Sequence, residues 1–125
     1  GITNIGLLKV DVDGFDWDVL DTYSFDEKPP IYMEEDFKEP WQYPKYYEIN
    51  HKLEQQGYNH IFMFDNFGCF IGYTQDWKVV NMMNSYFDRM KSGKSDQTIW
   101  YMDLLICQDK NADWLKQAVY MYSTI

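Results

Sequence analysis

A near-continuous apolar run, IGLLKVDV, occupies residues 5–12 and stops at an acid-rich turn. Apolar residues that follow one another without alternation are typical of a strand covered on both faces, as parallel strands are in α/β proteins. The next expected strand, Ile31–Glu35, is separated from the first by a helical pattern in which Phe15, Val19 and Tyr23 recur four residues apart. The sequence therefore predicts an α/β fold whose first two strands are parallel.

Further strands and helices follow along the chain. Pro44 suits the first turn of a helix and Gly57 suits its end. A longer helix is marked by an apolar stripe that comprises Val79, Val80, Met83, Tyr86, Phe87 and Met90, and Gly93 would end it. The remaining predictions are strands His60–Asp65 and Cys69–Tyr73 joined by a turn, a helix Trp77–Lys91, a strand Ile99–Cys107 and a helix Ala112–Tyr122. We expect one domain over residues 1–125, with a mixed sheet of parallel strands, then an antiparallel hairpin or edge strand, and flanking helices.

The charge balance narrows the range of partners. The net charge is −9 at pH 7, with no patch rich in Lys or Arg, so nucleic acid and acidic membrane surfaces would be repelled. No stretch approaches the roughly 20 apolar residues of a membrane span, and no signal peptide is visible. We therefore expect a cytoplasmic protein. The first residue is Gly1 rather than Met, which suggests a piece of a longer protein.

Cysteine and aromatic residues each allow two interpretations. Cys69 and Cys107 lie far apart without CxxC spacing, so they are expected to be reduced core thiols, with a disulfide as the alternative.

Aromatic residues make up 19% of the chain. Most would pack in the core and at its margin; the alternative is a surface whose rings meet a neighbouring domain or a substrate.

The densest chemical signal is a group of four aspartates, Asp11, Asp13, Asp16 and Asp18, around Gly14. Asp16 and Asp18 suit the capping and charging of the first turn of the following helix. Asp11 and Asp13 are two residues apart at the carboxyl end of the first strand, so they lean the same way. Ligands bind beyond that end of the strands in doubly wound sheets, which makes these two residues the candidates for chemistry.

A second acidic group, Glu34–Asp36, ends the next strand. If the two strands are neighbours, both groups converge on one rim of the sheet. A metal site built from Asp11, Glu34 and a histidine is an alternative. However, His51 falls within a helix and His60 opens a strand, so each is better explained as a surface or hydrogen-bonded histidine.

Two other acid motifs fit less well. A calcium-binding EF-hand loop has glycine at its sixth position and glutamate at its twelfth, whereas here Gly14 is fourth and Thr22 twelfth. Phosphatases that open with DxDG need a small hydroxyl residue soon afterwards and a later lysine and acidic pair. Phe15 and Trp17 stand in that region instead.

Five segments, in the same order, resemble the FkbM family of S-adenosylmethionine-dependent methyltransferases. They are KVDVDGFD at 9–16 with VL at 19–20, PI at 30–31 with Glu34, Leu53 with GY at 57–58, DNFG at 65–68, and YMDLL at 101–105. Asp13 and Asp16 stand where the family usually has glutamate, which shortens each side chain by one methylene.

The resemblance implies the C-terminal half of a Rossmann-like methyltransferase, from the fourth of seven strands onward. No loop of the GxGxxG kind occurs in the chain, so S-adenosylmethionine is expected to be bound mainly by a missing N-terminal half, and the chain alone to be inactive. The implied reaction is methyl transfer to a hydroxyl of a sugar or secondary metabolite. Asp11 and Asp13 are the candidate catalytic residues, Glu34 and Lys9 the candidate substrate-binding residues, and no metal ligand is assigned.

Two expectations about partners follow. The free edge of the first strand, Ile5–Val12, is apolar and lacks protective charges, so we expect a second copy or a missing segment to cover it. The other expected partner is a small-molecule or glycan acceptor. The alternative function is a non-catalytic binding module whose aromatic surface engages a protein or a carbohydrate.

Overall fold

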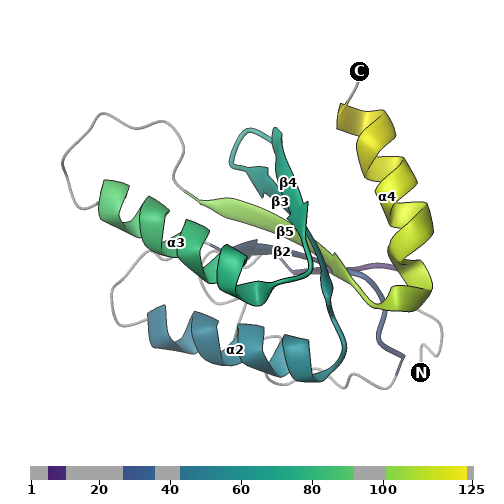
Figure 1. Ribbon diagram of the computed structural model, residues 1–125, viewed down its shortest axis with the longest axis horizontal. Coiled ribbons are helices and arrows are strands. Elements are labelled where there is room, and N and C mark those ends of the chain that lie inside the picture. Colours follow the sequence, from purple (N-terminus) through teal and green to yellow (C-terminus); the bar gives the residue numbers. More distant parts are fainter. Residues whose placement is uncertain (1–5, 11–26, 36–42, 92–100, 124–125) are drawn as a thin grey trace.

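The computed structural model of the chain describes residues 6–10, 27–35, 43–91 and 101–123 (Figure 1). Within these residues, one mixed sheet has the strand order β1-β2-β5-β3-β4. Its strands are β1 (Leu8–Val10), β2 (Ile31–Glu35), β3 (His60–Asp65), β4 (Phe70–Thr74) and β5 (Met102–Cys107). The predicted α/β class is confirmed.

The first two strands are parallel, as predicted. Leu8 pairs with Ile31 and Val10 with Met33, and the Leu8 amide donates to the carbonyl oxygen of Pro30 at 2.9 Å. β5 runs antiparallel to both β2 and β3, so β1, β2 and β3 all run in the same direction. Their carboxyl ends therefore share one edge of the sheet.

Three helices cover the described sheet (Figure 1). α2 (Tyr43–Gln55) and α3 (Trp77–Lys91) lie on one face, and α4 (Asp109–Ser123) lies on the other. The core under α2 and α3 includes Ile31, Met33, Leu53, Ile61, Val80, Leu104 and Ile106, all fully buried. The smaller core under α4 is built from Phe62, Phe64, Cys107, Ala112, Leu115 and Val119. Alternate residues of each strand supply the two cores, because successive side chains point to opposite faces.

α2 ends where Gly57 adopts a left-handed backbone conformation. Gly57 has a φ of 87°, a conformation that costs little without a Cβ. The Tyr58 amide donates to the Leu53 carbonyl at 3.1 Å and the Gly57 amide to the Glu54 carbonyl at 3.0 Å, which is the Schellman pattern. The buried ring of Tyr58 then joins Leu53 in the core. Gly57 thus ends the helix as the sequence predicts.

Side-chain hydrogen bonds fix the connections on either side of β4. Asp65 Oδ1 accepts hydrogen bonds from the amides of Phe67 and Cys69 at 2.8 and 3.0 Å, which closes the β3–β4 turn. Asp76 caps α3, because its Oδ1 accepts from the Lys78 amide at 2.9 Å. Trp77 anchors the same helix, its indole N–H donating to the Tyr58 carbonyl at 2.8 Å.

The predicted bounds of β2, β3 and α3 are confirmed. α4 begins at Asp109 rather than at residue 112, because the Gln108 carbonyl already accepts the Asn111 amide at 3.0 Å and an acid in the first turn suits the helix dipole. The expectation that Cys69 is a core thiol is wrong, because Cys69 is exposed. Tyr86, within the apolar stripe of α3, is 48% exposed. The predicted helix around residues 15–23 lies outside the described residues.

Candidate functional site

The two glutamates at the end of β2 face opposite sides of the sheet. Glu35 is 1% exposed on the side of α2 and α3, whereas Glu34 is half-buried on the side of α4. Consecutive residues of a strand alternate in this way. Glu34 and Glu35 therefore share the end of β2 but face opposite sides of the sheet, and of the two only Glu34 faces a partly open surface.

Glu35 is the centre of a buried polar network between β2, α2 and α3. Its Oε2 accepts a hydrogen bond from the Asn50 amide group at 3.4 Å and a short one from the Asn84 amide group. Asn50 and Asn84 are themselves 1% and 2% exposed. The Asn50 amide group also donates to Asn81 Oδ1 at 3.2 Å. These hydrogen bonds offset much of the cost of burying the three polar side chains.

This network holds the two helices in register rather than forming an open site. Tyr47 on α2 and Ser85 on α3 add a hydroxyl–hydroxyl bond of 3.0 Å along the same seam. Among the described atoms, Asn50 Oδ1 has no hydrogen-bond partner. The near-complete burial of Glu35, Asn50 and Asn84 favours a structural role for the network.

The other side of β2 presents the two sequence-predicted substrate ligands. Glu34 pairs in register with Asp103 of β5, and Lys9 pairs with Tyr32. The Tyr32 hydroxyl donates to Asp103 Oδ2 at 2.9 Å. Lys9 is exposed, and its Nζ lies 6.0 Å from the centroid of the Tyr32 ring. Lys9, Tyr32, Glu34 and Asp103 thus form one polar surface across β1, β2 and β5.

The two candidate catalytic residues, Asp11 and Asp13, lie outside the described residues. Asp11 follows Val10 directly in the sequence, and Val10 pairs with Met33, the residue before Glu34. The catalytic roles assigned to Asp11 and Asp13 from the sequence therefore stay predictions.

A hydrogen-bonded chain that the sequence did not reveal joins β4, β3 and α4. His60 Nδ1 lies 2.6 Å from the Tyr73 hydroxyl, and His60 Nε2 lies 2.6 Å from Asp109 Oδ1. The His60 ring is stacked near the Tyr73 ring, and Lys116 Nζ lies 4.7 Å from the centroid of that ring. His60 is thus a hydrogen-bonded histidine, as expected, and His51 is exposed, also as expected.

Cys107 lies beside this chain, paired in register with His60. Burial raises the pKa of its thiol to about 11, and the Asp109 carboxylate adds to the rise while Lys116 opposes it. A thiol with so high a pKa stays protonated at neutral pH and is a poor nucleophile. Cys69 and Cys107 are both free, so the disulfide alternative is wrong.

Neither a cluster of metal ligands nor a membrane-spanning helix occurs among the described residues. In ranges 6–10, 27–35, 43–91 and 101–123, no three His, Cys, Asp or Glu side chains gather as metal ligands would. None of the helices in the same ranges combines the length and the apolar character needed to cross a bilayer.

Comparisons with known proteins return no match: no family model, no curated protein and no solved structure is significantly similar to the chain. The fold class is therefore defined by the sheet and helices alone, as an α/β domain with a five-stranded mixed sheet.

Proposed function

We propose that the chain is the C-terminal part of an S-adenosylmethionine-dependent methyltransferase with a Rossmann-like sheet, which transfers a methyl group to a hydroxyl of a sugar or secondary metabolite. The observation that carries the proposal is the parallel pairing of β1 with β2. It sets the start of the KVDVDG segment beside the strand that contains Glu34, and these are the two acidic segments that resemble the FkbM family.

The strand directions support the same proposal. β1, β2 and β3 run in one direction, so ligands are expected beyond the edge where these strands end. Glu34 is half-buried near that edge, where its carboxylate is able to accept hydrogen bonds from the hydroxyls of an acceptor. Asp11 is the first candidate to receive the proton that leaves the acceptor hydroxyl, and Asp13 is the second.

The described residues do not fit the cofactor by themselves. Gly57 and Gly68 are used by a helix end and a hairpin turn, and Gly6 and Gly72 do not stand between a parallel strand and a helix start. A cradle of that kind is what an adenosyl cofactor needs. The proposal therefore assigns cofactor binding mainly to a part of the protein upstream of Gly1.

The test of cofactor use is calorimetry of the full-length protein with S-adenosylmethionine, alongside a check of the upstream reading frame for a glycine-rich strand–turn–helix. We expect saturable binding by the full-length protein and much weaker binding by the 125-residue chain. An upstream segment without such a loop, together with the absence of binding, would overturn the proposal.

The test of the residue roles is Asp11→Asn in the full-length protein. If Asp11 takes the proton, turnover falls by about 100-fold or more with little change in cofactor binding. Normal turnover by Asp11→Asn removes this role and leaves Asp13 as the candidate.

A non-catalytic binding module is the second candidate function. Exposed rings on α4 favour it, since Trp114, Tyr120 and Tyr122 are 52%, 49% and 60% exposed, and Phe67 at the β3–β4 turn is 70% exposed. Aromatic residues at such exposure are enriched in binding surfaces. The module is favoured over the enzyme if the full-length protein fails to bind S-adenosylmethionine.

A further inference from the structure

A cleft lies where α4 meets the sheet. Its volume is about 270 Å³. We call it the α4 cleft; its main walls are Tyr32, Phe64 and Leu105 from the sheet and Leu115, Val119 and Tyr122 from the helix. Pockets for drug-sized ligands start at about 300 Å³, so this volume suits one aromatic ring with a short side chain.

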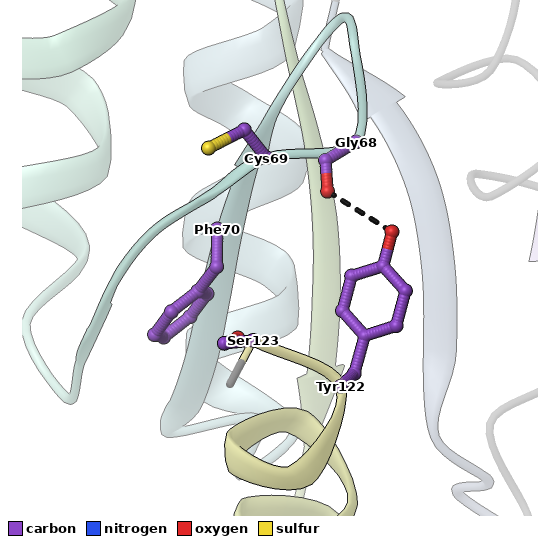
Figure 2. Close-up of a pocket in the computed structure, with 5 residues that line it drawn as sticks. All are labelled: Gly68, Cys69, Phe70, Tyr122 and Ser123. Carbon is purple, nitrogen blue, oxygen red and sulfur yellow. Dashed lines mark hydrogen bonds between the residues drawn. The ribbon is translucent and has the colours of Figure 1, made fainter. Parts of the chain in front are cut away.

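Tyr122 shapes the end of the α4 cleft that lies at the β3–β4 turn. Its hydroxyl donates to the carbonyl oxygen of Gly68 at 3.3 Å, across the gap between α4 and the turn (Figure 2). Tyr122 and Gly68 also line a second, larger pocket of about 660 Å³, which Cys69, Phe70 and Ser123 complete (Figure 2). The ring of Tyr122 thus stands between two cavities and forms an aromatic wall of each.

The polar groups next to the α4 cleft are acidic. Tyr32, in its wall, donates its hydroxyl to Asp103 Oδ2 at 2.9 Å. Asp103 pairs in register with Glu34 on one side and with Phe64, another wall residue, on the other. Both carboxyl groups are therefore on the face of the sheet that the cleft occupies, and neither is fully buried. Lys9 places its Nζ 6.0 Å from the centroid of the Tyr32 ring and brings a positive charge to the same face.

An apolar, aromatic slot with carboxylates beside it has a defined ligand preference. Apolar walls favour an aromatic ring, whereas carboxylates and the faces of tyrosine rings both attract a cation. An anionic ligand would be repelled by Asp103 and Glu34 and by the net charge of −9.

We propose that the α4 cleft binds a small aromatic amine, with the ring between Leu105 and Leu115 and the ammonium group at Asp103 and Glu34. This inference does not rest on methyl transfer. It applies to the 125-residue chain without a cofactor, so the result of its test does not depend on whether the proposed function is correct.

The binding test uses tyramine as the probe, titrated into the chain and followed by calorimetry and by amide chemical shifts. We expect saturable binding with a Kd below about 1 mM, a realistic value for a ligand of this size, and shifts at Tyr32, Leu105 and α4. Two comparison ligands separate the contributions: 4-hydroxyphenylacetate keeps the ring and reverses the charge, and butylamine keeps the charge without the ring. Both are expected to bind at least about tenfold more weakly.

Variants test the position of the ligand. Ala118 is exposed and lines the cleft, so Ala118→Trp is expected to fill it without disturbing the core, and to abolish binding. Gln117→Trp is the matched control, because Gln117 is exposed on the same helix and does not line the cleft. Asp103→Asn keeps an oxygen for the Tyr32 hydroxyl and removes the charge. This variant should weaken the binding of tyramine about tenfold and leave the binding of the uncharged 4-ethylphenol unchanged.

Three outcomes overturn the proposal. They are no saturable binding of tyramine up to about 10 mM, well above the expected Kd; equal or tighter binding of 4-hydroxyphenylacetate; and tyramine affinity unchanged in a folded Ala118→Trp variant. If Ala118→Trp does not fold, Asp103→Asn decides the question. An equal loss of affinity for tyramine and for 4-ethylphenol would show that Asp103 does not bind the ammonium group.

Discussion

Nε2 of His60 lies 2.6 Å from Oδ1 of Asp109 and so joins the first residue of β3 to the first residue of α4. The other ring nitrogen of His60 contacts the Tyr73 hydroxyl at the same distance. Through this one imidazole, the strand at the edge of the sheet, its neighbour β3 and the helix over them are tied together. The two contacts span 13 and 49 positions of sequence.

The first prediction concerns the hydroxyl of Tyr73. Tyr73→Phe keeps the ring, with its stacking on His60 and its tilted contact with Phe62, and removes only the partner of His60 Nδ1. Since His60 is 6% exposed, that nitrogen loses a hydrogen bond that water replaces poorly. We expect the free energy of unfolding to fall by about 1 to 2 kcal/mol in chemical denaturation.

The control for Tyr73→Phe is a double-mutant cycle with His60→Phe. If the hydroxyl acts through the imidazole, Tyr73→Phe should cost almost nothing in the His60→Phe background. An equal cost in both backgrounds would show that the hydroxyl stabilises the fold in another way.

The second prediction concerns the buried network around Glu35. Asn84→Ala removes an amide that donates to Glu35 Oε2 and leaves an acidic group, 1% exposed, with fewer donors. We expect a loss of about 2 to 3 kcal/mol in the free energy of unfolding. Asn81→Ala, on the same helix, removes a part-buried neutral bond to Asn50 and should cost about 1 kcal/mol.

The Glu35→Gln background tests whether the carboxyl group causes this difference. With a neutral amide at position 35, the additional cost of Asn84→Ala should shrink toward that of Asn81→Ala. A cost that is the same in both backgrounds would instead attribute the loss to the cavity left by the asparagine side chain.

The third prediction concerns the end of α2. An alanine at position 57 would have to adopt the φ of 87°, and its Cβ would meet the amide nitrogen of Gln108 at 3.0 Å. That side-chain amide donates to the Gln56 carbonyl at 2.6 Å, so Gly57→Ala disturbs both the backbone and a link to the residue between β5 and α4. We expect a loss of about 1 to 2 kcal/mol, measured by thermal or chemical unfolding. Gly72→Ala should change stability by about 0.5 kcal/mol or less, since its Cβ would meet no atom within 4 Å.

The sequence predicted the bounds of helices and strands better than it predicted which strands pair with each other. β2, β3 and α3 were predicted with the observed bounds, because alternation, a helical stripe and end signals such as Gly57 are local properties. The place of β5 between β2 and β3 depends on pairing between residues far apart in the sequence, which local patterns do not encode.

The candidate site also has features that a local pattern encodes and features that depend on contacts between distant residues. Alternation along β2 was enough to predict that Glu34 and Glu35 face apart, and that signal was missed. The contact of His60 with Tyr73 and Asp109 had no local signal, since each residue alone resembles an ordinary strand or helix position. The acidic pair of Glu34 and Asp103 likewise exists only because β5 lies next to β2.

The fourth prediction is a loss of stability at alkaline pH that is due to Cys107. Its thiol is fully buried and its pKa is raised from 9.0 to about 11, so the unfolded chain ionises first. The contribution of the buried, protonated thiol to the free energy of unfolding is fully present below pH 9. It is lost as the pH rises from 9 to 11, by up to about 2 to 3 kcal/mol. Because lysines and tyrosines also titrate there, the measurement is the difference in unfolding free energy between the wild type and Cys107→Ala at each pH. That difference should be constant from pH 6 to about 8.5, below the thiol's ordinary pKa, and should then shrink; a difference that stays constant to pH 11 would contradict the raised pKa.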